Sequence, residues 1–272
     1  MLTAVAATAP ALLSGSLDTR RFYSHSLGRI VRVIVYTPPN LRAGSTYPLA
    51  IFLHGVPGSP EYMTGLGIPQ RLEALIASGR SVPFLAAFPQ GNDTDDEDTE
   101  WADSAVDPRD RWETYVQRDL VRYLQKRYPL TRRRAARAIA GLSMGGYGAM
   151  NIALHNRDEF GTVESWSGYF TSNTPSVFAP GSHAWNVYSP ELYASELAPS
   201  LDADHPHISF YVGDADAFAG ENIRFSRMLR HLGVPHAFTL RRGQGHRRTL
   251  WASQLDPAIE FISRSFVADS EG

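Results

Sequence analysis

Short runs of apolar, β-forming residues alternate with helical patterns along most of this chain. Two continuous apolar runs, at residues 49–53 and 84–88, are typical of strands buried inside a parallel sheet. Further strands are predicted at residues 29–36, 136–141, 162–166, 208–212 and 236–240. Helices are predicted at residues 69–78, 112–128, 146–156, 221–232 and 257–266. This alternation predicts an α/β fold with a mostly parallel central sheet and helices on both faces.

The alternation continues without an internal repeat or a clear linker, although 272 residues could hold two domains. We therefore predict one domain over residues 1–272, with an N-terminal extension at 1–20. The segment 168–204 is rich in proline, serine and aromatic residues and has no strong period. Long segments of this kind are usually functional, so we expect it to form a cap or a pocket wall above the sheet. The apolar start lacks the positive charge of a secretory leader, and secreted and cytoplasmic locations both stay open.

The composition excludes several classes of protein and site. Cysteine is absent, which excludes disulfides, thiol nucleophiles, zinc–thiolate sites and iron–sulfur clusters. The 26 basic and 28 acidic residues give a formal net charge of −2, with no general attraction to nucleic acid or anionic lipid. No apolar run approaches the roughly 18 residues that cross a bilayer. We predict no cofactor, no metal, no nucleic-acid partner and no membrane span, and the oligomeric state stays open.

An acidic stretch at residues 92–100 (NDTDDEDTE) follows the predicted strand 84–88. Clustered carboxylates can bind calcium, but this stretch lacks the spacing of an EF-hand loop. The favoured alternative is a solvated loop, which could border a site because it begins at the carboxyl end of a strand.

The pentapeptide GLSMG at residues 141–145 matches the pattern G-x-S-x-G. A predicted strand leads into it and a predicted helix follows it, which is the strand–turn–helix setting of a nucleophile elbow. Ser143 would then lie above the carboxyl ends of the strands, at a helix N-terminus that stabilises developing negative charge. The alternative interpretation is a glycine-rich turn with an ordinary N-cap serine.

A serine hydroxyl is a weak nucleophile and needs a base, and the base needs a carboxylate that orients it. His246 follows the predicted strand 236–240 in a glycine loop, from which it can reach the serine. Asp214 and Asp216 follow the strand 208–212, again at a carboxyl end. The chain order serine, aspartate, histidine is that of α/β-hydrolases, and the residues alone leave both aspartates open.

Two backbone N–H groups are predicted to hold the oxyanion that forms when a serine attacks a carbonyl. One belongs to Met144, directly after the nucleophile, and the other to Val56, in the loop after the first apolar run. His54 in the same loop is expected to position it or to touch substrate. An aromatic-rich stretch suggests Trp166 and Trp185 as substrate contacts, with ordinary packing as the alternative.

At these motifs the chain resembles the esterase D, feruloyl esterase and antigen 85 group of α/β-hydrolases. The matching stretches are FLHGVPG at 52–58, IAGLSMGGYGA at 139–149, YVGDAD at 211–216, ENIRFSRMLRHLGVPH at 221–236 and GQGH with Trp251 at 243–251. The resemblance implies an α/β-hydrolase fold and a catalytic triad of Ser143, His246 and Asp216. It implies the same oxyanion donors as the residues alone suggest. One departure is Arg248, which stands where the group often has an aromatic residue.

The activity that the resemblance implies is that of a serine esterase acting through an acyl-enzyme. The expected partner is a feruloyl, acetyl or short-chain ester, either a small molecule or linked to carbohydrate. A thioesterase or an acyltransferase with the same triad is the nearest alternative. A transferase is less favoured, because the antigen 85 branch typically uses glutamate as its acid. The alternative from another class is a non-catalytic binding module, and the acyl and alcohol specificity stays open.

Overall fold

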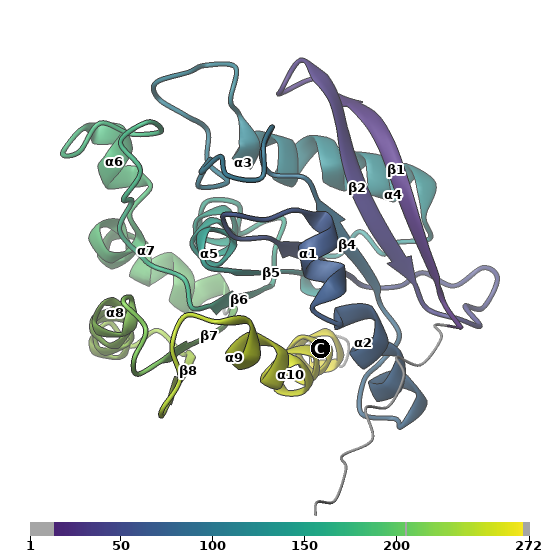
Figure 1. The fold of residues 1–272 in the computed structure, drawn as a ribbon. Helices are drawn as coiled ribbons and strands as arrows, with labels where there is room; N and C mark the ends of the chain where they lie inside the picture. The colour runs from purple at the N-terminus through teal and green to yellow at the C-terminus, as the bar shows by residue number, and fades with distance from the viewer. Residues whose placement is uncertain (1–13, 205, 269–272) are drawn as a thin grey trace, which may run out of the picture.

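The computed structural model describes residues 14–204 and 206–268, so positions 1–13 of the expected extension lie outside the described residues. The described chain forms an eight-stranded sheet in the order β1-β2-β4-β3-β5-β6-β7-β8 (Figure 1). Its strands are β1 (Ser16–Ser24), β2 (Arg29–Thr37), β3 (Leu49–Leu53), β4 (Leu85–Pro89), β5 (Arg137–Leu142), β6 (Thr162–Trp166), β7 (His207–Gly213) and β8 (Ala237–Arg241). Strands β3 to β8 pair in parallel, whereas β1 and β2 join one edge antiparallel. The prediction of a mostly parallel α/β sheet is confirmed.

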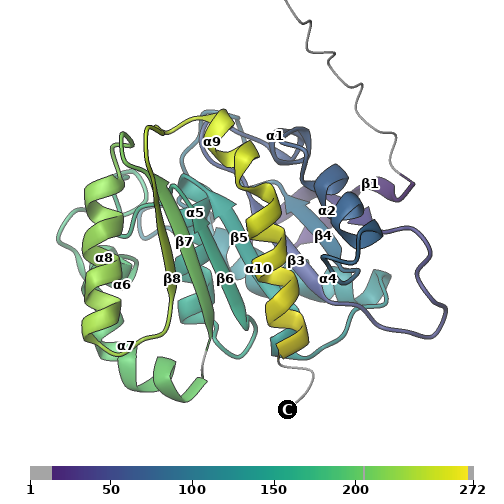
Figure 2. The same cartoon turned by 90° about the horizontal axis from the view of Figure 1, so that it is seen from below.

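Helices cover both faces of this sheet (Figure 2). They are α1 (Pro60–Gly65), α2 (Ile68–Ala77), α3 (Trp112–Thr114), α4 (Val121–Arg127), α5 (Met144–His155), α6 (His183–Val187), α7 (Pro190–Asp204), α8 (Ala219–His231), α9 (Arg248–Ser253) and α10 (Leu255–Ala268). Helices α1, α2, α9 and α10 pack in one core with strand residues such as Phe52. Helices α3, α4, α5, α7 and α8 pack in a second core, which includes Ile51, the residue before Phe52 in β3. Successive side chains of a strand point to opposite faces of the sheet. Because helices cover both faces, every side chain of a central strand is buried, and the strand sequence is largely apolar.

Three predicted segments differ from the structure. Residues 16–20, expected in the extension, belong to β1, whose polar sequence SLDTRRFYS carries no clear strand pattern and which pairs with β2. The predicted helix 112–128 is divided into α3, a π-helical part (Tyr115–Leu120) and α4. The segment 168–204, expected without regular structure, holds α6 and α7 besides irregular chain, and its role as a cap or pocket wall stays a prediction. In each case pairing or packing decides the local structure more than propensity does.

The loops after β3, β5, β7 and β8 leave the sheet at its carboxyl edge, because these strands run parallel. Every residue predicted for the triad and the oxyanion hole lies on one of these loops or at the helix start that follows it. In the part of the chain that the structure describes, no helix combines the length and apolarity needed to cross a bilayer.

Candidate active site

Ser143 lies at the sharp turn between β5 and α5. Its backbone has φ 55° and ψ −122°, a conformation that residues other than glycine rarely adopt. Glycine provides the room for this turn, since a Cβ built on Gly145 would lie 2.3 Å from the carbonyl oxygen of Leu53. A Cβ built on Gly141 would lie 2.3 Å from the carbonyl oxygen of Gly145. The serine therefore projects from a strained turn that only small neighbours permit.

His246 is hydrogen-bonded to both Ser143 and Asp216, from which it is separated by 103 and 30 positions of sequence. Its Nε2 lies 2.9 Å from Ser143 Oγ, and its Nδ1 lies 2.8 Å from Asp216 Oδ2. Beside an ionised carboxylate, Nδ1 carries the proton and donates it, which leaves the lone pair of Nε2 to accept the serine hydroxyl. The arrangement holds the imidazole in the tautomer of a base.

Backbone hydrogen bonds between the loops after β7 and β8 bring the aspartate to the histidine. The N–H of Ala215 donates to the carbonyl of Gln244 at 2.9 Å, and the N–H of Asp214 donates to the carbonyl of Arg241 at 3.0 Å. A Cβ built on Gly213 would lie 2.1 Å from the carbonyl oxygen of Gln244. A larger residue at this position would push the two loops apart.

The geometry distinguishes the two candidate aspartates. Asp214 is exposed, whereas Asp216 is buried and makes the hydrogen bond to His246. Burial alone would raise the pKa of Asp216, but hydrogen bonds from His246 and from the N–H of Phe218 hold it below its ordinary value. The hydroxyl of Ser167 acts in the same direction. The carboxylate is therefore ionised at neutral pH and can stabilise a charged imidazole.

Ser167 is a supporting residue that the motifs did not identify. Its Oγ accepts a hydrogen bond of 3.1 Å from Trp251 Nε1, and its φ is 48°. The rings of Trp251 and Phe218 meet the imidazole of His246 edge-on, with centroids 5.1 and 5.5 Å away. The place of Ser167 directly after β6, at the carboxyl edge, is the sequence feature that could have indicated it.

The loop after β3 lies directly against Ser143. A Cβ built on Gly55 would lie 3.0 Å from Ser143 Cβ, so glycine allows the close approach. Within the described ranges, the N–H groups of Val56 and Met144 have no hydrogen-bond acceptor. Val56 follows Gly55 and Met144 follows Ser143, and Gly55 and Ser143 are in contact. The two free N–H groups therefore belong to neighbouring parts of the site.

His54 has no exposed surface, so its side chain does not face the solvent side from which a substrate would come, and it holds the loop instead. Its Nδ1–H donates to the carbonyl of Gly55 at 2.8 Å, and its Nε2 accepts the N–H of Gly91 at 3.1 Å. Burial lowers the pKa of His54 to about 4. The ring is therefore neutral, and a single tautomer satisfies both hydrogen bonds.

The acidic stretch packs behind the same loop. The N–H of Gly58 donates to the carbonyl of Asp95 at 3.0 Å, and Asn92 Nδ2 donates to the carbonyl of Gly58 at 3.0 Å. Trp101 Nε1 donates to the carbonyl of His54 at 3.0 Å. Among the described residues, no three histidine, aspartate or glutamate side chains gather as a metal site would require. The contacts of this stretch with the loop are structural.

The two tryptophans suggested as substrate contacts occupy different environments. Trp166 is fully buried against Phe52 and Tyr211, so it is a core residue, and its carbonyl accepts the N–H of Ser143 at 2.9 Å. The suggestion of a substrate contact is corrected, because the strand turns this side chain into the sheet core. Trp185 is half-buried, with Nε1 donating to the carbonyl of Ser172 at 2.9 Å. A substrate contact of Trp185 stays a prediction.

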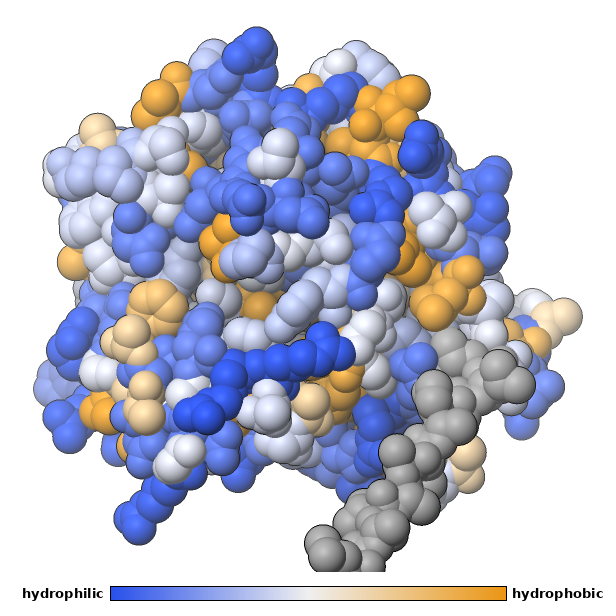
Figure 3. Space-filling view, viewed as in Figure 1, coloured by the Kyte–Doolittle hydropathy of each residue, from blue (hydrophilic) through white to orange (hydrophobic). Residues whose placement is uncertain are grey.

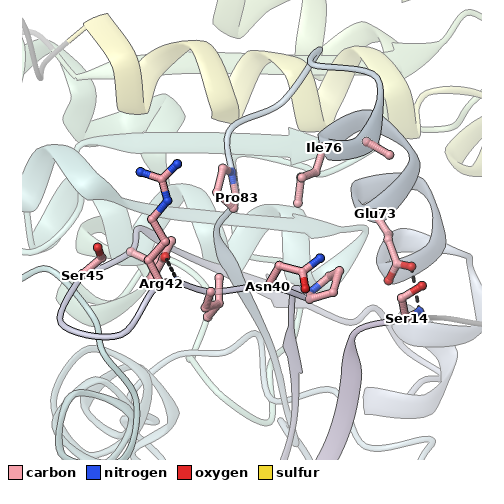
Figure 4. Close-up of a pocket in the computed structure, with 11 residues that line it drawn as sticks. Ser14, Asn40, Arg42, Ser45, Glu73, Ile76 and Pro83 are labelled. Carbon is pink, nitrogen blue, oxygen red and sulfur yellow. Dashed lines mark hydrogen bonds between the residues drawn. The ribbon is translucent and has the colours of Figure 1, made fainter.

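A cavity of about 670 Å³ lies at the other edge of the sheet, where β3 and β4 begin (Figure 4). Pro83, Ile76 and Asn40 line it, and Glu73 accepts the N–H of Ser14 at 2.7 Å beside it. None of the three hydrogen-bonded residues Ser143, His246 and Asp216 reaches this cavity. The cavity is therefore separate from the candidate active site.

The strand order and the serine held on a strained strand-to-helix turn define the chain as an α/β-hydrolase. It belongs to the Esterase family, whose model, described as "Putative esterase", matches residues 24–262.

Relatives and solved structures agree with this family. S-formylglutathione hydrolase of Paracoccus denitrificans is 27% identical over 269 residues, which cover 92% of this chain and 89% of that protein. Esterase Rv1288 of Mycobacterium tuberculosis is 29% identical over 155 residues, which cover 54% of this chain. That match spans only 31% of the relative, so the chain corresponds to a part of it. A solved ferulic acid esterase has a TM-score of 0.81 at 25% identity, over 92% of this chain and 99% of the other.

Proposed function

We propose that the chain is a serine carboxylic-ester hydrolase with the catalytic triad Ser143, His246 and Asp216. The observation that carries the proposal is an imidazole 2.9 Å from the serine hydroxyl and 2.8 Å from the carboxylate. A base in this position can take the proton of the serine as its oxygen attacks, and the carboxylate stabilises the resulting imidazolium. Membership of the Esterase family supports the same reaction.

The steps follow from the positions of the groups. Ser143 Oγ bonds to the carbonyl carbon while its proton passes to His246 Nε2. The N–H groups of Val56 and Met144 stabilise the charge on the carbonyl oxygen. The bond to the leaving oxygen breaks, His246 returns the proton to that oxygen, and the alcohol departs. Water then attacks the acyl-enzyme with the same base, which releases the acid and restores the serine.

The proposed substrates are feruloyl, acetyl or short-chain carboxylic esters, as small molecules or linked to carbohydrate. The similarity to a solved ferulic acid esterase supports the feruloyl member of this group. Thioester hydrolysis is a second candidate, which the S-formylglutathione hydrolase similarity over 92% of the chain favours. The same nucleophile, base and oxyanion donors would serve an ester and a thioester.

The test uses p-nitrophenyl acetate with the wild type and the variant Ser143→Ala. The wild type should release a rapid burst of p-nitrophenol, about one per enzyme molecule, and then turn over steadily. Ser143→Ala should lose the burst and at least about a thousandfold of the turnover rate, since no other group can form the acyl-enzyme. Ser176→Ala, at an exposed serine, is the matched control and should keep both.

A panel of acyl lengths, thioesters and added alcohols separates the remaining candidates. Transfer of the acyl group to the added alcohol in preference to water would identify an acyltransferase. Failure to turn over any ester or thioester would contradict the proposal and favour a binding module.

A further inference from the structure

Three exposed arginines lie on the loop that carries His246 or directly after it: Arg242, Arg247 and Arg248. Within the described part of the chain, none of them has a carboxylate oxygen within 4.0 Å. The chain as a whole has a formal charge of −2, so these three positive charges are a local group and not part of a generally basic chain. Figure 3 shows strongly hydrophilic side chains on the face of the molecule that bears α1 and α9.

The side chain of Arg248 is held in position by contacts that do not neutralise its charge. Its guanidinium donates a hydrogen bond to the carbonyl of Gly65 and lies 5.5 Å from the ring centroid of Tyr62. Both partners belong to α1, which follows the loop of the predicted oxyanion donor Val56. A carbonyl and an aromatic face fix the position of a cation and leave its net charge in place. Arg248 therefore stands at the side of the site between α9 and α1.

Arg247 folds back over the catalytic loop. A Cβ built on Gly245 would lie 3.1 Å from Arg247 Nη2 and 3.5 Å from its Nε. Gly245 directly precedes His246, so this guanidinium lies next to the backbone that holds the imidazole. Asp216 pairs with His246 and Glu61 of α1 pairs with Arg32, so neither of these carboxylates neutralises Arg247 or Arg248.

The position of the leaving group follows from the chemistry of the proposed function. His246 Nε2 must give its proton to the leaving oxygen, so the alcohol or thiol part of the substrate departs beside His246. Arg247 and Arg248 directly follow His246 in the chain, and the side chain of Arg247 lies against Gly245, which precedes it. A planar guanidinium that no carboxylate of the chain has paired can bind a carboxylate of a ligand through two parallel hydrogen bonds.

We propose that Arg247 and Arg248 select esters and thioesters whose leaving group carries a carboxylate. This inference rests on the proposed function, since it needs His246 as the proton donor to the leaving group. Arg242, exposed on the same loop four residues before His246, adds to the positive field of this group and so to the rate of encounter with an anion. The arginines then determine which alcohol or thiol is released, independently of the acyl group.

The test compares two acetate esters that differ in one charge, 4-acetoxybenzoate and its methyl ester. The measured quantity is the ratio of kcat/KM for the anionic ester over the neutral one, after correction for their rates of hydroxide hydrolysis. The wild type should prefer the anionic ester. Arg247→Gln and Arg248→Gln should each lower the ratio about three- to tenfold, mainly through KM, as expected for an exposed charge pair. Arg248→Lys should recover part of the loss, because the charge remains.

Salt and a distant arginine provide the controls. Raising the salt from about 10 mM to about 1 M shortens the screening length from about 30 Å to about 3 Å and should remove most of the wild-type preference. Arg230→Gln, an exposed arginine in the last turn of α8, should leave the ratio unchanged. The neutral ester, measured in the same variants, reports any loss of folding because both rates then fall together.

The possible failures are distinguishable. A wild-type ratio near one, or a ratio that neither substitution nor salt changes, overturns the role of the arginines while ester hydrolysis itself still stands. Absence of turnover for both esters in the wild type overturns the proposed function and this inference with it.

Discussion

The proposed chemistry depends on the imidazole of His246, because among the described residues it alone is hydrogen-bonded to both Ser143 and Asp216. Asp216 orients it, and Ser167 and Phe218 in turn hold Asp216 in its ionised form. Ser143 adopts a strained backbone conformation that presents its hydroxyl to the ring. At the scale of single residues, the proposed function depends on the direction of the hydrogen bonds at His246 and on the burial of Asp216 beside it.

Substitution of each aspartate by asparagine separates these roles. Asp216→Asn keeps the size of the side chain but removes the charge that holds the proton on Nδ1, so kcat should fall by about three to four orders of magnitude. Asp214→Asn, at the exposed neighbour, should leave kcat within about twofold. Steady-state rates on p-nitrophenyl acetate provide the measurement. Equal losses in the two variants would show that Asp216 has no special role.

At the scale of elements, close approach between loops assembles the site. The loop after β3 contacts the start of α5, and the loops after β7 and β8 are joined by backbone hydrogen bonds. His54 and the acidic stretch fix the first of these loops from behind. Glycines at the contacts are required by the distances between backbones.

The contact between α5 and β3 predicts the effect of a single methyl group. Gly145→Ala would place a Cβ 2.3 Å from the carbonyl oxygen of Leu53 and 2.6 Å from that of His54. Neither backbone can move freely, so we expect a loss of roughly 2–4 kcal/mol in the free energy of unfolding and a large loss of activity. Gly65→Ala, where no atom lies within 4 Å and φ is not positive, is the control and should cost less than about 1 kcal/mol. Urea denaturation of both variants checks this, and an unchanged stability of Gly145→Ala would contradict it.

At the scale of the whole molecule, two cores sandwich a sheet that is not apolar throughout. Glu164 lies fully buried in β6, where Ser209 Oγ is its hydrogen-bond partner at 3.3 Å and its Oε2 has none among the described residues. Burial raises the pKa of Glu164 to about 7. The folded protein therefore holds a proton on this carboxyl where the unfolded chain has released it.

This difference predicts how stability depends on pH. The pKa of Glu164 is near 4.5 in the unfolded chain and about 7 in the folded protein. Between these values the unfolded chain releases a proton that the folded protein keeps, so raising the pH through this interval favours unfolding. The contribution of Glu164 to the free energy of unfolding should fall by on the order of 3 kcal/mol across it. Glu164→Gln cannot ionise and should gain stability relative to the wild type between about pH 5 and about pH 8.

Urea denaturation at the two pH values measures this gain. Glu196→Gln, at an exposed glutamate of α7, controls for a general loss of negative charge and should show no comparable gain. A constant stability difference between Glu164→Gln and the wild type at both pH values would contradict the prediction.

The sequence predicted much of the fold because the parallel strands are buried on both faces. Residues 49–53 and 162–166 form strands within the predicted bounds, and the helix 146–156 is displaced by two residues at its start. Strand β1 was missed because its exposed edge position imposes no apolar pattern. Helices α6 and α7 were missed because the tertiary packing of side chains such as Tyr193, rather than a strong period, stabilises them.

Local chain chemistry by itself determined the strained turn at Ser143, since two glycines around a serine between a strand and a helix permit few other structures. It also determined the parallel sheet, whose strands are apolar wherever both faces are covered. Only the tertiary structure brought the carboxylate of Asp216, and not that of Asp214, to His246, and only it placed His54 and Trp166 in the interior. It also set the guanidinium of Arg247 against Gly245 and that of Arg248 against α1. The physical reason is that burial, hydrogen-bond direction and local charge depend on which distant segments meet, and spacing along one chain carries no information about that.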